Sequence, residues 1–73
     1  MALIEVKTEI TGNVWKILVE AGQSVAEDDP IMILESMKME IPVSAPEDGV
    51  VTEIQVDEGT TVTEGTVVAL MKA

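Results

Sequence analysis

Apolar and polar residues alternate along most of the chain, in short runs interrupted by turn-forming residues. Alternation with a period of two is typical of strands that bury one face. Val, Ile and Thr are abundant in these runs, and β-branched residues favour extended backbone. No segment follows the helical period of 3.6 residues over a useful length. The pattern predicts eight short strands, over residues 3–7, 13–19, 24–25, 31–35, 39–44, 50–56, 61–62 and 66–71.

The second half of the chain repeats the first. A shift of 37 residues, the separation of Gly12 from Gly49, aligns apolar residues and glycines in the same order without a gap. An internal repeat decides the architecture, and two copies are too few for a solenoid. The repeat, over about residues 4–34 and 41–71, therefore predicts two equivalent halves that close on each other about a quasi-twofold axis.

The predicted fold is all-β, a compact sandwich or flattened barrel with one core. The 73 residues suffice for one domain, so residues 1–73 should form a single unit. The chain has no cysteine, and Trp15 is its only aromatic residue, so aliphatic side chains must fill the core. Trp15 aligns with Thr52 in the repeat, so the fold needs no aromatic there. We expect Trp15 to cover an edge of the core, with a binding role as the alternative.

The midpoint of the repeat falls between two predicted strands and should be a hairpin tip. Such tips usually carry Gly, Asn, Asp or Pro, which accept positive φ or preset the turn. This tip has Met37, Lys38 and Met39, flanked by Glu35 and Glu40. Folding alone gives no reason to expose two large apolar side chains, so another protein should recognise them. The repeat also places Lys38 at one end of the molecule and both termini at the other.

The composition excludes most enzymatic mechanisms. The chain has no His, Cys, Tyr or Arg, so Ser–His and Cys–His pairs cannot form. A small domain almost without aromatics is also expected to lack a pocket of roughly 300 Å³ or more. The acidic turns at residues 27–29 and at Glu64 lack the spacing of a calcium loop. We therefore predict a protein that is not an enzyme, with no catalytic residue and no metal site.

The charge narrows the choice of partners. A formal net charge of −10, from 14 acidic residues and four lysines, disfavours nucleic acids and anionic membrane surfaces. No apolar run approaches the length of a membrane span, and the N-terminus lacks a signal-peptide pattern. A cytoplasmic, monomeric protein is expected.

Lys38 is better suited to be a substrate than a nucleophile. An exposed lysine stays protonated at neutral pH, and nearby carboxylates favour the charged form further. An enzyme that docks on the tip and brings an activated acyl group could modify Lys38. The alternative is that Lys38 is an ordinary solvated lysine in a turn, without a function.

The stretch Ile33–Glu40, with the sequence ILESMKME, resembles the attachment site of biotinyl domains, usually written E-A-M-K-M. Residues 12–22 and 45–51 also resemble these domains, so the resemblance covers nearly the whole chain. The chain looks closest to the free-standing biotin/lipoyl attachment proteins, of the biotin carboxyl carrier type. The resemblance implies two four-stranded antiparallel sheets with quasi-twofold symmetry and a lysine at a hairpin tip.

The resemblance also implies a function. Lys38 would carry biotin through an amide bond made by a biotin protein ligase. It would shuttle a carboxyl group between a biotin carboxylase and a carboxyltransferase on partner proteins. The ligase is expected to recognise Glu35, Met37, Met39 and Glu40, where the soft methionine side chains adapt to a partner surface.

The chain departs from the family pattern at two places, and the first of them keeps other cofactors open. Ser36 stands where biotinyl domains usually have Ala, and the ungapped repeat leaves no room for the thumb insertion of some bacterial carriers. Lipoyl domains typically carry Asp-Lys-Ala, where this chain has Met37, Lys38 and Met39. An acid three residues before the lysine, as Glu35 is, occurs in both groups. Attachment of lipoate, or of either cofactor, is therefore the first alternative, and an unmodified interaction domain is the second.

Overall fold

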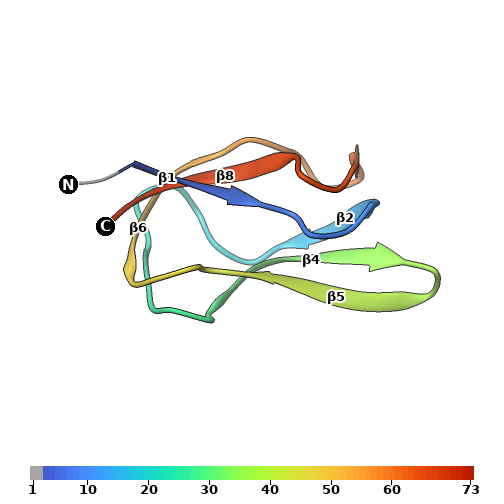
Figure 1. Ribbon diagram of the computed structural model, residues 1–73, viewed down its shortest axis with the longest axis horizontal. Coiled ribbons are helices and arrows are strands. Elements are labelled where there is room, and N and C mark those ends of the chain that lie inside the picture. The colour runs from blue at the N-terminus through green and yellow to red at the C-terminus, as the bar shows by residue number, and fades with distance from the viewer. Residues whose placement is uncertain (1–2) are drawn as a thin grey trace.

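Eight strands and no helix make up the computed structural model, which describes residues 3–73 (Figure 1). The strands are β1 (Leu3–Lys7), β2 (Gly12–Ile17), β3 (Ser24–Val25), β4 (Pro30–Ser36), β5 (Met39–Ser44), β6 (Gly49–Ile54), β7 (Thr61–Val62) and β8 (Val67–Lys72). Every predicted strand is present, with ends that differ by two residues at most. The all-β class is confirmed, and residues 3–73 offer no helix that could cross a membrane.

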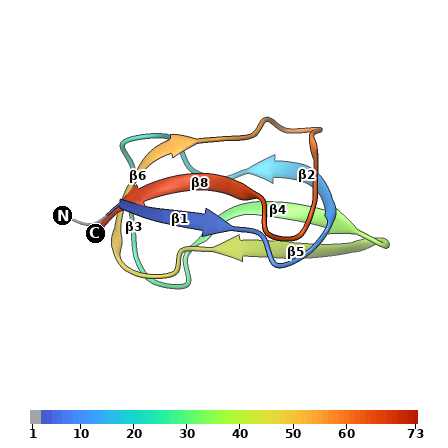
Figure 2. The ribbon, with the colours of Figure 1, turned by 45° about the horizontal axis from the view of Figure 1, so that its top comes forward.

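The strands form two four-stranded antiparallel sheets that pack face to face (Figure 2). Sheet A has the order β1-β8-β6-β3, and sheet B has the order β5-β4-β2-β7. Exchanging each strand for the one four places away in the chain converts one order into the other. The predicted flattened sandwich is confirmed, and the matching orders support the quasi-twofold relation between the halves.

Irregularities in strand pairing recur at the interval of the repeat. The β2–β4 pairing shifts register between Val14 and Lys16, and the β6–β8 pairing shifts between Val51 and Glu53, which are 37 residues further on. A bulge inserts one residue into a strand, bends it and increases its twist. Bulges at equivalent places therefore give the two sheets similar curvature.

Backbone hydrogen bonds join the two halves reciprocally. The Gly22 N–H donates to the Val51 carbonyl at 2.6 Å, and the Gly59 N–H donates to the Val14 carbonyl at 2.7 Å. The φ angles of Gly22 and Gly59 are 93° and 90°, in a left-handed region that glycine adopts without strain. The glycines at these two turns thus allow each half to bind the central strand of the other.

The core lies between the sheets and is almost entirely aliphatic. Its largest fully buried side chains are Ile31, Met32, Leu34, Met71, Val14, Val51 and Val68. Burial of one such side chain contributes roughly 1.5–3 kcal/mol. Trp15 is 47% exposed and does not belong to this core, so the expectation that it covers a core edge is wrong. Aliphatic side chains already fill the space between the sheets.

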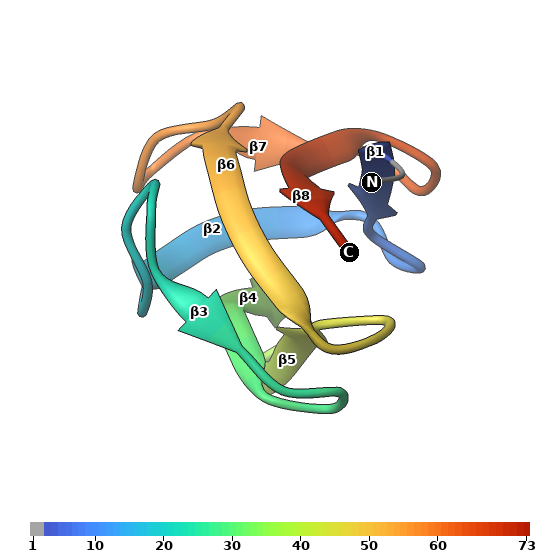
Figure 3. The same ribbon diagram turned by 90° about the vertical axis from the view of Figure 1, so that its left-hand side faces the viewer.

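The β4–β5 turn lies at the end of the molecule opposite the start of β1 and the end of β8. Figure 1 shows the start of β1 and the end of β8 on the left and the β4–β5 turn on the right. Figure 3, viewed from the left of Figure 1, shows β1 and β8 meeting at that end. Because the molecule measures 36 × 17 × 17 Å, the two features are separated along its long axis. This confirms the predicted placement of Lys38.

Gly12 allows β2 to approach β4 closely beneath the turn. A Cβ atom at this position would lie 2.6 Å from the carbonyl oxygen of Glu35. Gly12→Ala should therefore lower the free energy of unfolding by roughly 1–3 kcal/mol, as overpacking does. Urea denaturation followed by circular dichroism would measure the loss. Glu53→Ala, at an exposed strand position, should change stability by less than about 0.5 kcal/mol. Equal midpoints for Gly12→Ala and the parent would contradict the prediction.

Candidate functional site

Met37 and Lys38 form the two-residue loop between β4 and β5. Ser36 pairs with Met39 directly beneath the loop, where the strand ladder closes. Met37 has a φ of 51° and Lys38 a φ of 66°, so both residues are left-handed. Two successive positive φ angles are characteristic of the type I′ turn, which suits a two-residue hairpin loop. The predicted hairpin tip is confirmed.

The residues at this tip do not favour its conformation. Left-handed backbone costs about 1–2 kcal/mol per residue for side chains such as Met37 and Lys38, because Cβ crowds the carbonyl oxygen. Glu35 and Glu40 are directly opposite each other across the strands, and like charges in such a pair are destabilising. Since both carboxylates are exposed, water screens much of that repulsion. Strained residues at an exposed turn point to a function there.

The two methionines of the tip project into solvent. Met37 is 92% exposed and Met39 is 61% exposed, and Lys38 between them is also exposed. Within residues 3–73 the single ion pair joins Lys7 Nζ to Glu5 Oε1 at 3.9 Å. In this described part of the chain, no carboxylate holds the amine of Lys38. An unrestrained amine of this kind fits covalent attachment by an external enzyme.

A well-packed base supports the tip. Strand β4 has neighbours on both sides as far as Glu35, which pairs with Asn13 of β2. One residue further into the sheet, Leu34 is fully buried. Only the pair of Ser36 with Met39 and the loop itself extend beyond this three-strand support. The base of the hairpin is therefore held in place, while the side chain of Lys38 beyond it is exposed.

The structure brings all the predicted site residues together on the β4–β5 hairpin, and each of them is exposed. They are Glu35, Met37, Lys38, Met39 and Glu40. The tip thus offers one primary amine between two thioether side chains, with two carboxylates behind them. This arrangement is suited to accept a group on the amine and to be recognised by another protein.

A groove of about 340 Å³ lies between residues 5–10 and residues 41–46, so the expectation that the chain lacks such a pocket is wrong. The groove exists because β1 and β5 are edge strands of different sheets and do not pair with each other (Figure 2). Its ionisable side chains are carboxylates and one lysine, including Glu5, Lys7 and Glu9. Without His, Cys or Tyr in the chain, it contains no activated nucleophile.

Comparison with known proteins decides the family. Residues 4–71 match the biotin/lipoyl family model, described as "Biotin-requiring enzyme". The chain belongs to this family. It is 45% identical over 62 residues to the biotin/lipoyl attachment protein of Bacillus subtilis (strain 168), covering 85% of each chain. The resemblance inferred from the ESMKME stretch is therefore confirmed.

Larger proteins contain a similar segment. The chain is 45% identical over 67 residues to the biotin-dependent acyl-coenzyme A carboxylase alpha3 subunit of Mycobacterium leprae (strain TN), but spans only 11% of that subunit. The crystal structure of Kluyveromyces lactis urea carboxylase matches with a TM-score of 0.93 and 32% identity, over 99% of this chain and 6% of that one. The match extends over every strand of the sandwich.

Met37→Asn tests whether the turn is strained. Asn tolerates left-handed backbone better than Met, so the variant should gain about 0.5–1 kcal/mol in the free energy of unfolding. A gain of about 1 kcal/mol would raise the Tm by roughly 4–8 °C in a domain of this size. Thermal unfolding followed by circular dichroism measures this. Met39→Ala, just outside the loop, is the control and should melt close to the parent. A Tm for Met37→Asn at or below the parental value would refute the strain.

Proposed function

We propose that this protein is a biotin carrier. Lys38 bears biotin through an amide bond and delivers a carboxyl group from a biotin carboxylase to a carboxyltransferase on partner proteins. The observation that carries the proposal is an exposed amine on a strained two-residue tip between two solvent-facing methionines. Membership of the biotin-requiring family and similarity to segments of carboxylases support it.

The chain contributes position rather than catalysis. The chemistry of carboxyl transfer resides in biotin, and the hairpin holds its attachment point at the end of the molecule remote from the start of β1 and the end of β8. A tethered group reaches a second site at a high effective concentration. Because the base of the tip is packed and only the lysine side chain is free, the arm can reorient without unfolding of the sandwich.

The modifying enzyme is a biotin protein ligase, for which this chain is a substrate. Amide formation requires a neutral Lys38 amine to attack an activated biotinyl carbonyl, with loss of a proton and of the activating group. Among the described residues no carboxylate is paired with the Lys38 amine, so we assign the base for that proton to the ligase. Glu35 and Glu40 attract a basic ligase surface, while Met37 and Met39 pack against it.

A lipoyl carrier is the second candidate, because the similar Bacillus subtilis protein is named for both cofactors. The Asp-Lys-Ala pattern of lipoyl domains is absent here, since Met37 and Met39 flank Lys38. We favour biotin for this reason. We also propose that the carrier acts as a monomer in the cytoplasm. The net charge of −10 opposes self-association, and the lack of cysteine is compatible with that compartment.

Intact mass measures the proposed modification directly. After incubation with purified biotin ligase, biotin and ATP, the parent chain should gain one biotinyl group. Lys38→Arg keeps the positive charge but cannot form the amide, so it should gain none. Lys16→Arg, which alters another exposed lysine, should still gain one. A biotinylated Lys38→Arg variant, or an unmodified parent, would refute the proposal.

Met37→Asp tests whether Met37 determines which cofactor is attached. This substitution supplies the acid that precedes the lysine in lipoyl domains, so biotinylation should slow and lipoylation by a lipoate ligase should accelerate. The ratio of the two initial rates, followed by mass, is the readout. Ser36→Ala restores the usual biotinyl residue and should keep the preference for biotin. An unchanged ratio for Met37→Asp would show that Met37 does not set the choice.

A further inference from the structure

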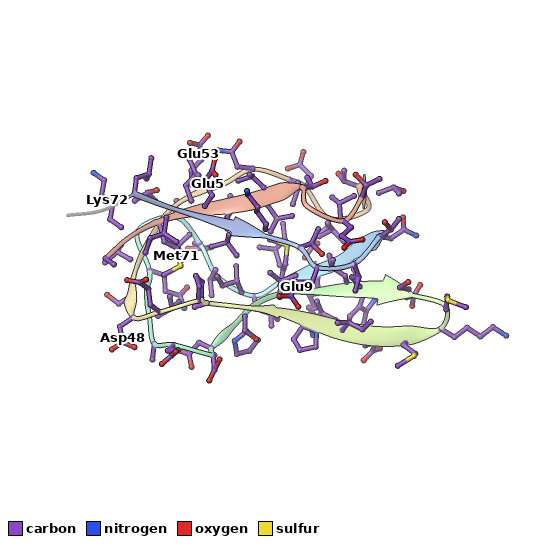
Figure 4. All side chains as sticks on the ribbon, viewed as in Figure 1. Glu5, Glu9, Asp48, Glu53, Met71 and Lys72 are labelled. Carbon is purple, nitrogen blue, oxygen red and sulfur yellow. The ribbon has the colours of Figure 1, made fainter. Side chains whose placement is uncertain are left out.

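The outer faces of the two sheets share a backbone pattern but differ in chemistry. Register pairing defines a row of side chains across sheet A that consists of Glu5, Leu70 and Glu53. Figure 4 shows Glu5 and Glu53 on the same outer side of that sheet. The row 37 residues away, across sheet B, consists of Pro42, Ile33 and Lys16. Two acids at the ends of the first row are thus replaced by a proline and a lysine in the second.

Trp15 and Leu18 enlarge this difference. Trp15 is 47% exposed and Leu18 is 41% exposed, both in or just after β2. Trp15 is the extra residue at the register shift of β2, and Lys16 Nζ lies 6.0 Å from the centre of its ring. The equivalent positions in sheet A are Thr52 and Gln55. At these two positions sheet B therefore has apolar residues where sheet A has polar ones, although sheet A also has one strongly exposed apolar residue, Leu3 of β1, which is 62% exposed.

Trp15, Leu18, Ile33 and Pro42 form an apolar patch on sheet B, and the repeat provides an internal control that shows whether the fold requires it. Sheet A shows that polar residues at these positions are compatible with the same strands, bulges and turns. The fold therefore does not require Trp15 or Leu18 to be apolar. Exposed tryptophan is also a frequent contributor to binding energy at protein interfaces. A contact with another protein explains these residues, whereas the packing of the chain does not.

The position of the patch, close to the tip, favours the enzyme that modifies Lys38 as the partner. The patch lies on the sheet that carries the tip, and Ile33 is five residues before Lys38, at most about 16 Å away at ~3.3 Å per residue. A standard interface buries about 800 Å² on each partner and extends roughly 30 Å across, enough to include both. The ligase active site must reach the amine at the end of one lysine side chain, so the ligase must also contact the hairpin that carries it. A carboxylase meets the longer, loaded arm and can stand further away.

The charges around the patch indicate the character of the partner surface. Glu35 lies two residues from Ile33 on the same face of β4, and Glu40 is its register partner. Lys16, beside Trp15, is the one cation in the rows described above. With a net charge of −10 on the chain, a partner with an apolar centre and a basic rim is complementary.

We propose that the outer face of sheet B, formed by Trp15, Leu18, Ile33 and Pro42, is the surface on which the biotin ligase docks to modify Lys38. The inference rests on the proposed carrier function. The ligase presents an apolar depression to the indole ring and basic side chains to the acids at the base of the tip. Docking on this face orients the hairpin so that the lysine amine enters the ligase active site.

The other half of the chain supplies the test variant. The double substitution Trp15→Thr, Leu18→Gln installs the residues that sheet A carries at equivalent places, so the fold should persist. We expect the KM of the ligase for this variant to rise tenfold or more, with kcat changed less than twofold. The matched control, Thr52→Ala with Gln55→Ala on sheet A, should be biotinylated with parental KM and kcat.

A second measurement detects ligase binding at Trp15 without any substitution on the outer face of sheet B. Because Trp15 is the only tryptophan, 5-fluorotryptophan labelling gives one ¹⁹F resonance. In a Lys38→Arg background, which prevents turnover, added unlabelled ligase should shift or broaden this resonance. An unmoved resonance at ligase concentrations above the parental KM would overturn the inference.

The outcomes separate the two hypotheses. A double variant with parental KM overturns the docking inference and leaves the carrier function intact. A double variant that is biotinylated normally but used poorly by the carboxylase assigns the face to that enzyme, and also overturns the inference. A parent chain that gains no biotin overturns both.

Discussion

The closure of two equal halves over one aliphatic core is the constraint on which the rest of the structure depends. The 73 residues contain no cysteine and one tryptophan, so the halves are held by aliphatic packing and by reciprocal backbone hydrogen bonds. Gly22 and Gly59 make these bonds from matching left-handed turns. Because the halves repeat, the turn between β4 and β5 lies opposite the start of β1 and the end of β8. The exposed position of Lys38 is thus a consequence of how the core closes.

The same repeat separates what folding requires from what it does not. Where both halves carry similar residues, as at the bulges and the turn glycines, the shared geometry explains them. Where they differ, as at Trp15 and Thr52, the fold has left the choice open. The tip combines a packed base at Leu34 with a loop in which Met37 and Lys38 are strained by left-handed φ angles. Stability lies in the sandwich, and the residues that we assign to recognition, those of the tip together with Trp15 and Leu18, lie on or beside sheet B.

The strands, the repeat and the hairpin tip could be predicted from the sequence because alternation and glycine spacing are local signals. The left-handed φ angles of Met37 and Lys38 could not, since neither residue favours them and strand pairing imposes them. The exposure of Trp15 was not expected because hydrophobicity alone favours burial, whereas Trp15 is the extra residue at a register shift of β2 and is 47% exposed. The groove between β1 and β5 follows from two edge strands that do not pair, a tertiary feature without a sequence signal.

If the fold singles out Lys38 for modification, accessibility alone cannot be the reason, because the other three lysines are also exposed. They are Lys7, Lys16 and Lys72. The most direct measurement isolates the chain from cells that contain a biotin ligase and maps the occupancy of each lysine by tandem mass spectrometry of its peptides. Biotin at Lys38 alone is the predicted result. Biotin distributed over several lysines, or none at Lys38, would contradict it.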